Sequence, residues 1–119
     1  MSGPIDDAVF AGLVEMTGGD LEFVDELVDT YLEDGDAQIA AMRAAIEAGD
    51  VAGLTRAAHS MKSSSLNVGA LELGERCRSL EERGRGGSVP DAPATIAAIG
   101  DGFAAARAAL LEARAARSA

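Results

Sequence analysis

The sequence contains a single histidine, His59, with Arg56 three positions before it and Lys62 three positions after it. On an α-helix both basic residues lie about one turn from the imidazole, so both can approach its edge. A neutral imidazole is a nucleophile near physiological pH, and ammonium and guanidinium groups bind anionic oxygens. The spacing therefore predicts a site that holds an anionic group beside His59.

The segment 51–67 that carries His59 is predicted to be an amphipathic helix. Apolar or small residues recur in it at steps of three and four, namely Leu54, Ala57, Ala58, Met61, Ser65 and Val68. On a wheel of about 100° per residue, His59 falls about 140° from the centre of this stripe. We therefore expect His59 on the solvent face, where a partner can reach it.

Four other segments show the same periodicity, at 5–17, 21–48, 70–83 and 94–116. Gly49-Asp50 predicts a helix stop followed directly by a helix start, and so short a joint makes the two long helices antiparallel neighbours. The Gly- and Pro-containing stretch 84–93 is predicted to be a loop. The fold class predicted is all-α: an antiparallel up-down four-helix bundle with a short additional N-terminal helix, forming one domain over 1–119.

Two helix faces make specific predictions about the core. The first helix is expected to bury one stripe, made of Ile5, Val9, Leu13 and Met16. The helix at 70–83 is expected to bury a second stripe, made of Ala70, Leu73, Gly74, Cys77 and Leu80, with Glu81 at its rim. Cys77 is interpreted as a small core hydrophobe.

Composition limits the possible partners and location. Twenty acidic residues against ten basic residues give a net charge of −10. So acidic a surface disfavours nucleic acids and anionic membranes. Asp101 and Arg107 interrupt the apolar C-terminal stretch, so we expect no membrane span. One cysteine cannot form an internal disulfide, which is compatible with a reducing, cytoplasmic location.

The residues around His59 resemble the active helix of the histidine-containing phosphotransfer (HPt) domains of bacterial and plant phosphorelays. Their pattern is His-x-x-Lys-Gly-Ser-Ser with Gly-Ala a few residues later, matched here by His59, Lys62, Ser64, Ser65, Gly69 and Ala70. Ser63 stands where the family usually has glycine. The similarity extends to residues on both sides of the motif: Gly49, Asp50, Leu73, Cys77, Leu80 and Glu81.

The resemblance implies a phosphorelay intermediate that accepts a phosphoryl group on His59 and passes it on. The donor would be a receiver-domain aspartate or a hybrid histidine kinase, and the acceptor another response-regulator receiver. Lys62 would stabilise the phosphoryl group, and Arg56, Ser63 and Leu66 are expected to form a partner docking face. The chain would be a monomeric phosphocarrier rather than an enzyme, holding no cofactor, while the partner receiver supplies the divalent metal, Mg²⁺.

Other interpretations stay open on the sequence. The same helix face would also suit a non-phosphorylated adaptor that binds receiver or kinase domains. His59 could be a plain surface histidine, and Arg56 could pair with an acid on the long helix instead. A histidine kinase would need a nucleotide-binding domain that 119 residues cannot add to this bundle. A metal site is disfavoured, because one histidine and one inward-facing cysteine make no ligand cluster.

Overall fold

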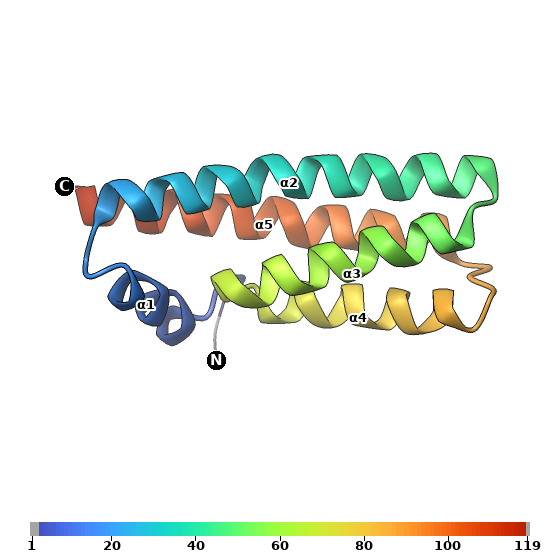
Figure 1. Cartoon of the computed structure of the whole chain (residues 1–119), viewed down its shortest axis with the longest axis horizontal. Coiled ribbons are helices and arrows are strands. Elements are labelled where there is room, and N and C mark those ends of the chain that lie inside the picture. The colour runs from blue at the N-terminus through green and yellow to red at the C-terminus, as the bar shows by residue number, and fades with distance from the viewer. Residues whose placement is uncertain (1–2, 119) are drawn as a thin grey trace.

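The computed structural model describes residues 3–118. These residues form five α-helices: α1 (Asp7–Met16), α2 (Leu21–Ala48), α3 (Val51–Val68), α4 (Leu71–Arg85) and α5 (Ala92–Ser118). No strand occurs in this part of the chain, which confirms the all-helical prediction. Figure 1 shows α2 to α5 along the long axis of the molecule, each running opposite to the helix before it, with the short α1 across one end.

Local side-chain chemistry sets the helix boundaries. The side chains of Asp6, Asp20 and Asp50 accept hydrogen bonds from backbone N–H groups at the starts of α1, α2 and α3. These bonds satisfy donors that have no partner inside the helix. Gly49 and Gly69 end α2 and α3 in the left-handed conformation, at φ 68° and 92°. The predicted helix stop at Gly49 and helix start at Asp50 are confirmed.

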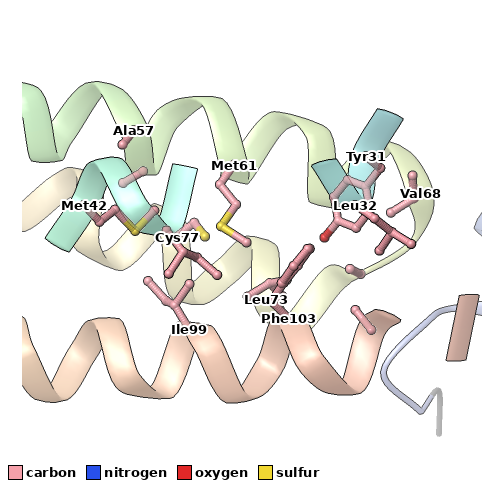
Figure 2. Close-up of a cluster of buried hydrophobic side chains, with 14 of the residues drawn as sticks. Tyr31, Leu32, Met42, Ala57, Met61, Val68, Leu73, Cys77, Ile99 and Phe103 are labelled. Carbon is pink, nitrogen blue, oxygen red and sulfur yellow. The ribbon is translucent and has the colours of Figure 1, made fainter. Parts of the chain in front are cut away.

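The core joins α2, α3, α4 and α5, and the most extensive helix contact is between α3 and α4. Figure 2 shows aliphatic, aromatic and sulfur-containing side chains converging there, including Tyr31, Met42, Met61, Cys77, Ile99 and Phe103. The rings of Tyr31 and Phe103 meet edge to face with 5.7 Å between centroids. Gly35 of α2 lies against Phe103, where a methyl group would collide with the ring. The predicted core stripe of α4 is buried as expected, but Glu81, predicted at its rim, is only 1% exposed. Its carboxylate can be buried because side chains of α3 and α4 bind it.

The predicted stripe of α1 is wrong in part. Met16 is 85% exposed, and the buried positions of α1 are Phe10 and Val14. The N-terminal segment is anchored by a hydrogen bond from the Asp6 amide to the Gly69 carbonyl oxygen, at 2.7 Å. That anchor holds the start of α1 against the end of α3.

The predicted loop 84–93 is too long at both ends. Helix α4 continues to Arg85, and α5 starts at Ala92, which is buried. Glycine content suggested a loop at residue 84, but Gly84 is helical because it packs directly against Thr55 of α3. Arg85 is therefore the last residue of α4, the helix that faces His59.

Helix α5 is long and apolar enough to span a membrane by length and composition alone, over Ala92–Ala116. Asp101 and Arg107 therefore do not exclude a span by composition. In the bundle, four larger apolar side chains of α5 are buried against the other helices, namely Ile96, Ile99, Phe103 and Leu110, whereas Leu111 is exposed.

Candidate functional site

His59 projects from the middle of α3 towards α4. Its side chain is 54% exposed, so the predicted solvent-facing position is confirmed. The Nδ1 atom lies 2.7 Å from Oε2 of Glu81 on α4. One edge of the imidazole is therefore held by the protein, and the other edge faces outward.

Glu81 accepts hydrogen bonds from three side chains while being only 1% exposed. Lys62 donates to Oε1 at 2.7 Å, and Arg85 donates to Oε2 at 2.6 Å, the same oxygen that binds His59. The Lys62 hydrogen bond is the main cause that lowers the pKa of the Glu81 carboxyl, with further contributions from His59 and Arg85. These interactions outweigh burial, which by itself would raise that pKa. Glu81 is therefore a buried carboxylate in its ionised form.

The ionised carboxylate fixes the tautomer of the neutral imidazole. A carboxylate can only accept hydrogen bonds, so Nδ1 of His59 must carry a proton to bind Glu81. In the neutral ring, Nε2 then keeps its lone pair. Among the side chains that the structure describes, none forms a hydrogen bond with Nε2. In the neutral ring, Nε2 is therefore a nucleophile on a half-exposed side chain.

Two glycines of α4 allow this contact between the helices. A methyl group at Gly84 would collide with Oγ1 of Thr55, and one at Gly74 would collide with the side chain of Leu66. Glu81 lies between these two close contacts. Helices α3 and α4 thus lie close together before and after Glu81. This close packing allows the Glu81 carboxylate to bind side chains of α3.

The structure brings only part of the predicted site together. Lys62 lies beside His59, but its ammonium group is bound to Glu81. Arg56 is exposed and lines a groove between α2 and α3, together with Asp50 and Ser60. Among the described residues, no hydrogen bond or ion pair joins Arg56 to His59. Both cations were expected to approach the imidazole. Instead, the Glu81 carboxylate binds both Lys62 and His59, and Arg56 does not take part.

The other two predicted residues lie three positions apart on α3 and differ in exposure. Ser63 is exposed, one turn after His59, and its hydroxyl makes no hydrogen bond to any residue whose side chain the structure describes. Leu66 was expected to be exposed but is half-buried, because its side chain covers Gly74 of α4. Arg56 and Ser63 are thus open to a partner, whereas Leu66 is only half accessible.

Sequence reasoning missed the roles of Glu81 and Arg85. The available signal was a glutamate on the apolar stripe of α4, because a buried carboxylate requires hydrogen-bonding partners. Arg85 gave no such signal, since it was assigned to a loop. In the described part of the chain, no three His, Cys, Asp or Glu side chains lie close enough together to hold a metal ion.

The comparisons with known proteins agree with this geometry. The family model described as Hpt domain matches residues 26–114. No curated protein sequence matches the chain significantly. Among solved structures, histidine-containing phosphotransfer protein B (HptB) from Pseudomonas aeruginosa PAO1 is similar, at 34% identity and a TM-score of 0.88 over 96% of each chain. The chain therefore belongs to the Hpt domain family and has a histidine phosphotransfer role in a phosphorelay.

Proposed function

We propose that His59 is the residue that carries the phosphoryl group, bound through Nε2. The observation that supports this most strongly is the hydrogen bond between Nδ1 and the buried Glu81 carboxylate, which leaves Nε2 as the free nucleophile. In this proposal a receiver-domain aspartate, or a hybrid kinase, donates the phosphoryl group, and a second receiver aspartate accepts it. Helices α2 to α5 act as the antiparallel bundle that presents the histidine, and α1 is an addition to it.

The transfer step balances without an external base. The Nε2 lone pair attacks phosphorus, the P–O bond to the donor aspartate breaks, and the aspartate leaves as a carboxylate. The ring becomes positively charged as the N–P bond forms, while the proton stays on Nδ1. Glu81 lies 2.7 Å from that proton-bearing nitrogen and stabilises the developing charge. The reverse sequence returns the phosphoryl group to the next receiver.

The charge distribution of the chain favours an anionic group at this position. Six of the ten basic residues but only four of the twenty acidic residues lie between Val51 and Arg85, the stretch that forms α3 and α4. A phosphoryl group adds about two negative charges, so a local excess of cations is favourable. Lys62 lies one turn after His59 on α3, and in this proposal it stabilises the phosphoryl group while bound to Glu81. The divalent metal, Mg²⁺, comes from the receiver.

The proposal includes a docking face for the receiver, an oligomeric state and a cellular location. Arg56 and Ser63 are exposed on α3 and would contact the receiver, with Leu66 at the border towards α4. The protein would act as a cytoplasmic monomer and phosphocarrier. The non-phosphorylated adaptor is the alternative, since it would use the same face.

Phosphotransfer from a phosphorylated receiver tests this function. The wild-type protein should become labelled with acid-labile phosphate, while His59→Gln should not. Lys62→Ala should be labelled more slowly, with an unchanged circular dichroism spectrum. Equal labelling of wild type and His59→Gln would refute the proposal, and binding of the receiver without labelling of the wild type would favour the adaptor.

A further inference from the structure

We propose that Arg85 is a positioning residue for phosphotransfer, which acts through Glu81 to keep His59 unprotonated and therefore nucleophilic. This inference rests on the proposed role of His59. It concerns a residue on α4 that contacts neither the imidazole nor, by any contact described, the reacting nitrogen. Its effect passes through one carboxylate oxygen.

The geometry places two donors on the same oxygen. Nη2 of Arg85 lies 2.6 Å from Oε2 of Glu81, and Nδ1 of His59 lies 2.7 Å from that same atom. Arg85 is four residues after Glu81 on α4, so its side chain follows the helix surface back to the carboxylate. The guanidinium is 64% exposed, whereas the carboxylate that it binds is 1% exposed. A solvent-facing cation is thus held against a buried anion beside the imidazole.

The charges around Glu81 indicate how the Arg85 contact affects the protonation of His59. The side chains bound to it are Lys62 and His59 from α3 and Arg85 from its own helix. An isolated carboxylate would stabilise the protonated imidazole, because an opposite charge within hydrogen-bonding distance favours the charged form. With Lys62 and Arg85 in place, two cations already exceed the single carboxylate in charge. A third cation, protonated His59, would make the cluster still more positive, so each of these two cations opposes protonation of the ring.

Arg85 and Lys62 differ in how they act. Lys62 binds Oε1 and leaves Oε2 to the imidazole, whereas Arg85 shares Oε2 with it. Sharing weakens the attraction of that oxygen for the Nδ1 proton without removing the orientation of the ring. Arg85 therefore lets Glu81 hold the imidazole in place while limiting how strongly it promotes protonation.

The test compares Arg85→Ala and Arg85→Lys with a control, Arg83→Ala. Arg83 lies on the same helix, but its guanidinium binds Asp91 and Thr95 and does not touch Glu81. The first measurement is the NMR titration of the imidazole, which is unambiguous because the chain has one histidine. The second is the rate of chemical phosphorylation by phosphoramidate as a function of pH. In that reaction the N–P bond to His59 forms as the P–N bond of the donor breaks and ammonia leaves, so no receiver is needed.

For Arg85→Ala we expect the imidazole titration to move to higher pH by about one unit, as for loss of a neighbouring charge. The rising limb of the rate profile should move with it, which lowers the rate about tenfold at pH values below the midpoint. Arg85→Lys should lie close to wild type, and Arg83→Ala should match it. An unchanged titration midpoint in Arg85→Ala, or a rate that falls equally at every pH, would overturn the proposal. Failure of the proposed function would give a different result. The wild-type protein would then not transfer phosphate, while the histidine titration would still shift in Arg85→Ala.

Discussion

The carboxylate of Glu81 and the imidazole of His59 meet across the α3–α4 contact, with 2.7 Å between Oε2 and Nδ1, although the two residues are 22 positions apart in the sequence. The contact combines a buried anion with a largely exposed ring. It orients the histidine, sets its tautomer and leaves Nε2 available.

Glu81→Gln should slow phosphoryl acceptance by about tenfold or more, the scale seen when a partner that orients a histidine is lost. The amide keeps the size of the side chain but removes the negative charge that stabilises the positively charged ring. The measurement is the single-turnover transfer rate from a phosphorylated receiver. Glu82→Gln is the matched control, since Glu82 is the exposed neighbour on α4. Equal rates for Glu81→Gln and wild type would show that the carboxylate has no part in transfer.

Glu81 should also make the free energy of unfolding depend on pH in the acidic range. The hydrogen bond from Lys62, supported by His59 and Arg85, lowers the pKa of the Glu81 carboxyl from its ordinary value of 4.5. The stabilisation by Glu81 is then complete above about pH 4.5 and is lost as the pH falls through the lower value of the folded protein. Denaturant titrations of wild type and Glu81→Gln should therefore differ most near neutral pH and converge in acid. A difference that grows as the pH falls would have the wrong sign.

Gly84→Ala should destabilise the protein by about 1–3 kcal/mol, the range for overpacking. In an open helix position the same change would stabilise by up to about 1 kcal/mol, so the sign decides whether the close contact exists. The methyl group would meet Oγ1 of Thr55, whose hydroxyl is bound to the Val51 carbonyl oxygen at 2.8 Å and cannot turn away freely.

A second substitution separates this clash from a general effect of alanine. Adding Thr55→Ala to Gly84→Ala should recover part of the lost stability, as measured by chemical denaturation in a double-mutant cycle. The transfer rate of Gly84→Ala should also fall, because α4 would move Glu81 away from His59. A more stable Gly84→Ala protein would contradict the packing described here.

Sequence signals predicted the elements of this fold better than they predicted its site. Asp50 and Gly49 act on their immediate neighbours, so the joint between α2 and α3 could be placed from local chemistry. The Glu81–His59 contact depends instead on the packing of two helices, and no periodicity within either helix specifies it. The role of Arg85 could not be predicted for a related reason. Gly84 predicts a loop at this point of the sequence, and only its packing against Thr55 of α3 explains why it is helical.

Ser63→Gly should lower the free energy of unfolding by roughly 0.5 kcal/mol while leaving transfer intact or faster. Glycine is the poorer helix former, but it would leave more room for the backbone of a partner one turn after His59. The checks are the melting temperature and the transfer rate to one receiver. A large loss of transfer would instead indicate that the Ser63 hydroxyl binds the ring or the phosphoryl group.

The most direct test of the central claim is to identify the phosphorylated atom by NMR of the ¹⁵N-labelled, phosphorylated protein. Phosphorus–nitrogen coupling distinguishes the two ring nitrogens of the single histidine. We predict that the phosphoryl group is on Nε2 of His59, with the proton retained on Nδ1 towards Glu81. Phosphate on Nδ1, or on any residue other than His59, would contradict the account.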